Sequence, residues 1–221
     1  MKPIPGVTAP ASDWGVSLED VVAVVAVALT VVFAWPQVFR ALRHGVHGVS
    51  AGAITQSMVA AAAWLGYGIA RGLVPVLVAN LGVMSGQLVV TLELVRNRAI
   101  PRGRAAAAIT GAVALIALAQ VGVLTDPIVA VAGFVAVTSV LTQLLEVRRE
   151  PHRLEGLSAS TYALLTAMCA AWFVYGLLLS DVVIIATNVV AFPMAAYIAW
   201  AASRSHHELE EANDPRSSAA R

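Results

Sequence analysis

Two aromatic and polar pairs recur at one spacing inside otherwise apolar sequence. Trp64 precedes Asn80 by 16 residues, and Trp172 precedes Asn188 by the same 16 residues. A Trp ring offers an apolar face with one N–H group, whereas an Asn amide both donates and accepts hydrogen bonds. An Asn in an apolar helix is costly unless it faces protein or water. The four side chains together suit a ligand with C–H faces and many hydroxyl groups, which is the chemistry of a sugar.

Each of these residues also has a purely structural interpretation. A Trp in a membrane helix commonly anchors it at the lipid headgroups, and an Asn can link neighbouring helices through its amide. The turns expected near 72 and 180 lie 8 residues from every member of the two pairs. At a rise of 1.5 Å per residue this places all four about 12 Å from the turns. A shared depth favours the ligand interpretation.

The pairs belong to an internal repeat, and such repeats fix the architecture of a chain. In both copies a Ser precedes the Trp by 14 residues, and a Tyr follows the Trp by 3 residues. Only the basic loops differ, since Gln to Ser is 13 residues in the first copy and 15 in the second. The repeated positions are Gln37 and Gln143, Ser50 and Ser158, Tyr67 and Tyr175.

Composition places the repeat in a membrane. The 221 residues are 59% hydrophobic and only 12% charged, which excludes an ordinary soluble domain. A hydrocarbon core about 30 Å thick needs roughly 20 apolar residues per helix. The sequence therefore predicts an all-α membrane protein with seven transmembrane helices, at 20–39, 53–71, 74–94, 105–123, 127–145, 160–179 and 182–202.

The fourth span has no partner in the repeat. Three helices per copy would leave the second copy upside down, and one additional crossing restores parallel orientation. Transporters are commonly built from such repeats, with the substrate held between them near the midplane. We expect a tail at 1–19, a first three-helix repeat at 20–95, a linker helix at 96–126, a second repeat at 127–203 and a second tail at 204–221.

Positive charge is distributed unequally between the two sides of the membrane. One side carries only Lys2 and Arg71, whereas the other receives all the remaining Arg residues. Because cytoplasmic loops collect Lys and Arg, we expect the N-terminus outside and the C-terminus in the cytoplasm, across the cell membrane. The Arg residues on the cytoplasmic side are Arg40, Arg43, Arg96, Arg98, Arg102, Arg104, Arg148, Arg149, Arg153, Arg204, Arg216 and Arg221.

The sequence carries no signature of catalysis. It contains no nucleophile paired with a base, no Gly-rich phosphate loop and no HExxH motif. His44 and His47 lack the Cys or carboxylate that would complete a metal-ligand set, and Cys169 is the only cysteine. Few basic residues lie away from the cytoplasmic side, which argues against nucleic acid. We expect no enzyme, no metal and no cofactor.

The pair Pro36-Gln37, followed by a basic loop and Gly48-Val49-Ser50, resembles the PQ-loop superfamily, here within a plan of three, one and three helices. The Trp–Asn spacing of 16 in both copies is similar to the sugar-transporting SWEET and SemiSWEET proteins. This resemblance spans about residues 20–202. It implies facilitative transport of a mono- or disaccharide by alternating access, with Trp64, Asn80, Trp172 and Asn188 as the substrate-binding residues.

The chain departs from that family at its hinges. Thr142 precedes Gln143 where the first copy has Pro36. The prolines that SWEET proteins use as hinges in spans 2, 5 and 6 have no counterpart, so Pro36 is left as the candidate hinge. Gln37 and Gln143 lie at cytoplasmic helix ends, where an amide could either satisfy backbone groups or take part in gating.

The candidate gate lies at the outer turns. Arg71 and Asp181 carry opposite charges there and could pair when the cavity faces inward, or both could simply be solvated. Tyr67 and Tyr175 precede these turns. The complete candidate set for hinge and gate is Pro36, Gln37, Gln143, Tyr67, Tyr175, Arg71 and Asp181.

Two further functions remain as alternatives within the PQ-loop superfamily: a proton-coupled amino-acid exporter, and a receptor or accessory protein that does not transport. Coupling to protons needs an ionisable group within the membrane. The acidic residues Glu93, Glu146, Asp20 and Asp181 all lie at span ends, which favours uniport. The expected partners are a small-molecule sugar and the lipid bilayer, and a homo-oligomer is left open.

Overall fold

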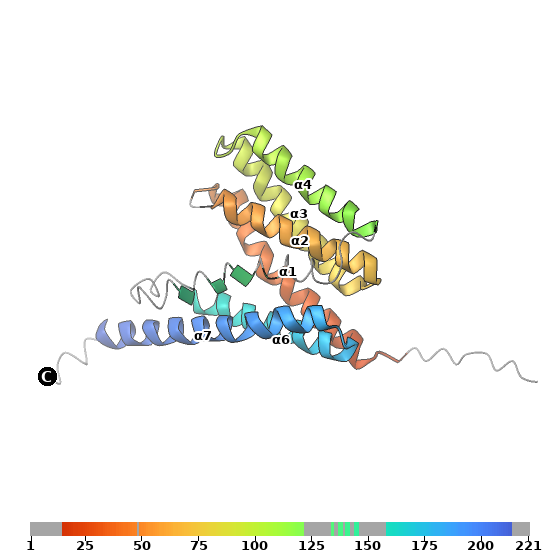
Figure 1. Ribbon diagram of the computed structural model, residues 1–221. Coiled ribbons are helices and arrows are strands. Elements are labelled where there is room, and N and C mark those ends of the chain that lie inside the picture. Colours follow the sequence, from red (N-terminus) through yellow and green to blue (C-terminus); the bar gives the residue numbers. More distant parts are fainter. Residues whose placement is uncertain are drawn as a thin grey trace, which may run out of the picture.

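Six long helices make up most of the described structure, a computed structural model (Figure 1). It describes residues 15–47, 49–121 and 158–213, with side chains up to 205, and the separate residues 134, 137, 138, 140, 141, 144 and 145. No strand occurs in these ranges. The helices are α1 (Leu18–His44), α2 (Ala51–Arg71), α3 (Val74–Arg96), α4 (Arg102–Gln120), α6 (Ala159–Leu179) and α7 (Val182–Asn213).

All six helices are long and apolar enough to cross a membrane, which confirms an α-helical membrane protein. The fifth expected span, at 127–145, lies mostly outside the described residues, and those described within it are helical. The plan of seven helices in two repeats therefore stays a prediction. Helix α7 continues to Asn213, so the first ten residues of the expected tail are helical. This stretch contains three Glu residues, with one Leu and one Ala, and these residue types favour helix even outside the apolar region.

The helices form two groups that meet along α1 (Figure 1). In the first group α3 contacts both α1 and α2, and α4 packs against α2. In the second group α6 and α7 pack against each other as a hairpin. Helix α1 also contacts α6, so it joins the groups. We call α1–α3 the first half and α6–α7 the second half.

Matching caps fix the register of the two halves. Ser50 and Ser158 each accept a hydrogen bond from the backbone N–H three residues later, at 3.3 Å, and so begin α2 and α6. Gly72 and Ser180 end these helices in the left-handed conformation, with φ of 66° and 55°. Because α2 and α6 begin and end at equivalent positions, their repeated residues lie at the same distance from the two turns.

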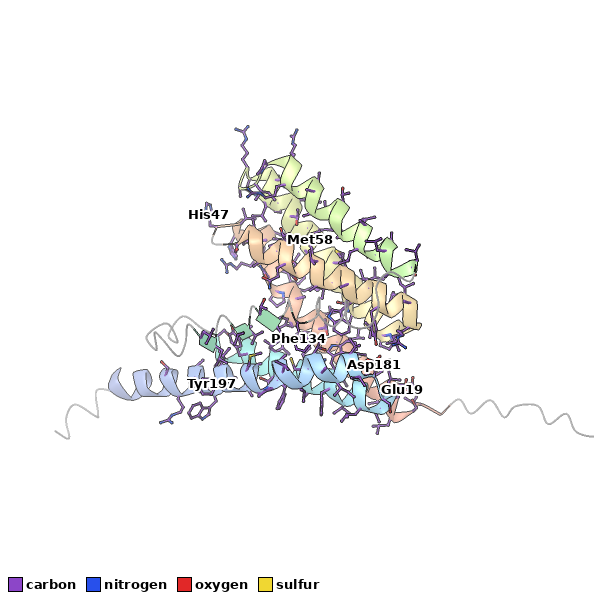
Figure 2. The ribbon with its side chains drawn as sticks, in the orientation of Figure 1. Glu19, His47, Met58, Phe134, Asp181 and Tyr197 are labelled. Atoms are coloured by element: carbon purple, nitrogen blue, oxygen red, sulfur yellow. The ribbon has the colours of Figure 1, made fainter. Side chains whose placement is uncertain are left out.

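The molecule has two distinct ends, which we name for their connections. The turn end carries the tight turns at Gly72 and Ser180 and the start of α1, and Figure 2 shows Glu19 and Asp181 there. The loop end carries the connection between α1 and α2, marked by His47 in Figure 2. Pro36 and Pro193 both lie inside helices that continue through them.

Candidate functional site

A cavity of about 510 Å³ lies between the two halves, a volume within the usual range for small-molecule sites. Residues of α1, α2, α3, α6 and α7 line it. The structure brings together in its wall all four predicted binding residues: Trp64, Asn80, Trp172 and Asn188.

The two Asn side chains have the same geometry. The Nδ2 of Asn80 donates to the carbonyl oxygen of Val76 at 2.8 Å, and the Nδ2 of Asn188 donates to that of Ile184 at 2.8 Å. Each bond satisfies one N–H of the amide and orients it along its own helix. The carbonyl oxygen and the second N–H of each amide have no partner in the described part of the chain. Both can therefore bond a ligand.

The two Trp side chains match in position but differ in bonding. Each ring meets a Tyr edge-on, Trp64 with Tyr67 at 5.7 Å and Trp172 with Tyr175 at 5.6 Å between centroids. The Nε1 of Trp172 donates to the Oγ1 of Thr30 on α1 at 2.9 Å. The indole N–H of Trp64 has no partner among the residues that the structure describes. Only the first half therefore presents an indole N–H to a ligand.

Buried side chains close the cavity at its turn end. Tyr67 and Tyr175 are 3% and 2% exposed, and they pack in one cluster with Val76 of α3 and Ile184 of α7. This cluster combines residues of both halves, with Ala23 of α1 among them. The halves are therefore in direct contact at this end of the cavity.

A hydrogen bond also joins the halves at the turn end. The hydroxyl of Tyr67 donates to Asp181 Oδ2 at 2.7 Å. The other oxygen, Oδ1, accepts from the backbone N–H groups of Val183 and Ile184, each at 3.0 Å, and so caps α7. The guanidinium of Arg71 lies over the ring of Tyr67, 5.6 Å from its centroid. Tyr67 thus lies in the contact between the turns, where we expected Arg71 to pair with Asp181 directly.

The cavity opens at its loop end. Three of its lining residues, Gln37 of α1, Ala53 of α2 and Thr161 of α6, are exposed. Gln37 therefore lies at the rim of the cavity, and its part in gating stays a prediction. Pro36 is exposed and does not line the cavity. Gln143 lies outside the described residues.

Several polar lining residues were missed by the sequence analysis. Thr30 receives the Trp172 bond, and Gln56 donates to Thr138 Oγ1 at 2.9 Å. Ser57 and Gln87 also line the cavity. A signal existed, because Ser57 and Gln87 lie 7 residues from Trp64 and Asn80, on the same helix faces. They lack polar counterparts in the second copy, so the repeat did not reveal them.

The lining residues contain no acidic or basic side chain among the residues described. In the same ranges no three His, Cys, Asp or Glu side chains gather as metal ligands would. The cavity wall instead combines amides, hydroxyls, two indoles and aliphatic side chains. Such a wall can bind a neutral, hydroxyl-rich molecule by hydrogen bonds and by stacking on the Trp rings.

Comparison with known proteins places the fold. No family model and no curated protein matches the chain. Among solved structures, a eukaryotic SWEET transporter superposes with a TM-score of 0.69 at 18% identity, over 85% of this chain and 98% of that one. At this identity the likeness concerns the fold. The chain has a SWEET-like fold, as the loop motif and the Trp–Asn spacing predicted.

Proposed function

We propose that this chain is a facilitative transporter of a mono- or disaccharide. The observation that carries the proposal is the matched layer of Trp64, Asn80, Trp172 and Asn188, which line one cavity between two halves. The aromatic faces and the unpaired amide groups suit the C–H faces and hydroxyls of a sugar. The SWEET-like fold supports the same substrate class.

Alternating access is the mechanism that the shape of the cavity favours. The turn end is closed by a cluster from both halves, and the loop end is open. Opening the turn end and closing the loop end would present the same four residues to the other side. In this proposal the halves belong to parallel repeats at 20–95 and 127–203, and the Tyr67–Asp181 bond with Arg71 forms the outer gate.

The charge distribution supports one orientation in the cell membrane. We infer that the N-terminus is outside and that the loop end faces the cytoplasm, because the Arg-rich loops lie there. The structure then corresponds to an inward-facing state. A Cys at Ser205, in a C169A background, should react with an impermeant thiol reagent only after the cells are permeabilised. Labelling of intact cells at that position would reverse the orientation.

Uniport is favoured over the proton-coupled export of amino acids. An amino acid carries two charges, and a proton-coupled carrier needs an ionisable group within the membrane. The described wall of the cavity has no charged side chain to pair with an amino acid and no ionisable group to carry a proton. A receptor or accessory role would leave the cavity without transport, and the experiment below separates that alternative.

The test is uptake by liposomes that contain the purified protein. A panel of radiolabelled monosaccharides, disaccharides and amino acids should show saturable, downhill uptake of at least one sugar, with the same rate when a proton or sodium gradient is imposed. Empty liposomes and the double variant N80A/N188A serve as controls. Accumulation above equilibrium that a protonophore abolishes would exclude uniport, and the absence of uptake of any sugar would exclude the function.

A further inference from the structure

Gln87 on α3 is a buried amide without a structural explanation. It is 9% exposed and lines the cavity. Its Oε1 is buried and has no hydrogen-bond partner among the residues described. Other polar side chains of the same wall do have partners, such as Gln56 with Thr138. A buried amide left unpaired is costly, so its presence calls for a ligand group.

The position of Gln87 separates it from the Trp–Asn layer. It follows Asn80 by 7 residues on the same helix face, toward the loop end. Two helical turns correspond to about 10 Å along α3. This distance exceeds the span of one six-membered sugar ring and is comparable to the length of two joined rings. Both positions face one continuous cavity.

Among the described residues of the helix pairs α2–α3 and α6–α7, the polar lining groups at this depth belong to the first half. The position equivalent to Gln87 in the second copy is Ala195, which is fully buried. Ser57 lines the cavity on α2, 7 residues before Trp64, and its equivalent is Leu165. The matched layer therefore contacts a ligand from both sides, whereas the level of Gln87 offers hydrogen bonds from one side and an apolar wall on the other.

We propose that Gln87 determines specificity by bonding the second unit of a disaccharide whose first unit lies in the Trp–Asn layer. This inference rests on the proposed sugar transport. The amide can both donate to and accept from ring hydroxyls, with Ser57 beside it in the same wall. The apolar second half contacts the C–H face of that unit. A monosaccharide held between the Asn side chains does not reach Gln87.

The test compares two sugar lengths in liposomes that contain the purified protein. The variant Q87M keeps the length of the side chain and removes its hydrogen bonds. It should lower the transport efficiency for sucrose or maltose about tenfold, because a buried hydroxyl loses its partner. Glucose transport should remain within twofold of the parent. The matched control is Q120M, which removes an exposed amide on α4 away from the cavity and should change neither sugar.

A second variant guards against misfolding. Q87N keeps an amide but shortens it by one methylene group, so it should lose the disaccharide in the same way. Equal losses for glucose and for the disaccharide, or no loss for either, would overturn the inference while leaving sugar transport intact. A parent protein that carries only monosaccharides would also overturn it. A parent that carries no sugar at all would instead refute the proposed function.

Discussion

The two halves of the molecule agree at the level of the cavity and disagree on either side of it. In the shared layer both Asn amides bond the carbonyl four residues earlier at 2.8 Å, and both Trp rings meet a Tyr edge-on. Toward the loop end the first half has Gln87 where the second has Ala195. Toward the turn end the second half has Asp181 where the first has Leu73.

This difference separates two tasks. The matched layer can contact a small ligand from both sides, which suits the proposed transport by alternating access. In the proposed function, the unmatched positions would orient the ligand and control the ends of the cavity. Leu73 begins α3 without a side-chain hydrogen bond, whereas Asp181 caps α7 and also accepts from Tyr67. At the turn end the Tyr67–Asp181 hydrogen bond therefore adds to the packing of the buried cluster from both halves.

The largest effect is expected where the halves agree. In N80A or N188A, a ligand hydroxyl would lose its partner in a partly dry site, at a cost of about 1–3 kcal/mol or roughly tenfold or more in transport efficiency. Because a sugar lacks twofold symmetry, the two losses should be unequal. Uptake by liposomes measures both, and the amount of folded protein in the membrane should match the parent.

A matched control sits next to one of these residues. Ser85 is an exposed polar residue of α3 that bonds only its own helix, through Gly82. S85A should therefore transport as the parent does. If N80A and N188A also transport as the parent does, the four residues of the layer serve packing alone, and the proposed function loses its support.

The fold and the shared layer could be read from the sequence because they follow from spacing. Apolar length gave the six described spans, and the repeat placed Trp64, Asn80, Trp172 and Asn188 at one depth. The Ser caps at 50 and 158 made this counting reliable. Gln87, Ser57 and Thr30 were missed because their equivalent positions in the second copy are apolar, so the repeat did not single them out.

The contact between the two turns shows a second limit of prediction from the sequence. Opposite charges suggested that Arg71 pairs with Asp181, whereas the structure places Tyr67 in contact with both. Opposite side-chain charges indicate which residues attract each other. They do not reveal that two backbone N–H groups of α7 already bond one oxygen of Asp181. Competition between partners is a property of the assembled turn and cannot be counted along the chain.

The next effect tests the hydrogen bond between Tyr67 and Asp181 at the turn end. Y67F removes the hydroxyl that bonds Asp181 and keeps the ring that lies under Arg71, so the closed end should be weakened by about 1.5 kcal/mol, or roughly tenfold in the opening equilibrium. The readout is the labelling rate, from the turn side, of a Cys at Val76 in a C169A background. Y175F is the matched control, since the Tyr175 hydroxyl has no partner in the described ranges and should leave the rate unchanged. Faster labelling in both variants would show that ring packing, not the bond, closes this end.

A smaller effect should distinguish the two Trp residues. W64F removes an indole N–H that has no acceptor among the residues described and can donate to a ligand oxygen. Sugar binding should therefore weaken about fivefold, as for the loss of one neutral hydrogen bond. W172F removes the bond to Thr30, which should lower the free energy of unfolding by about 1 kcal/mol with less effect on binding. Titration of the purified protein and its thermal unfolding measure the two outcomes. T30V should reproduce W172F and not W64F; equal binding losses in W64F and W172F would remove the proposed asymmetry.

The smallest effect concerns the two turns themselves. Gly72 and Ser180 both adopt the left-handed conformation, which an L side chain enters at a cost of roughly 1–2 kcal/mol in a regular helix and which Gly enters freely. S180G relieves this strain but gives the unfolded chain more freedom, so a net stabilisation of a few tenths of a kcal/mol is expected.

G72A has no neighbour within 4 Å to clash with, and it should destabilise the protein by about 1 kcal/mol through its backbone alone. G111A, equally unobstructed but inside α4, should instead stabilise it by about 0.5–1 kcal/mol. Denaturant unfolding in detergent measures all three variants. If S180G destabilised the protein instead, the Ser180 side chain would stabilise the second turn. The first turn, which has Gly72 at this position, would lack that contribution.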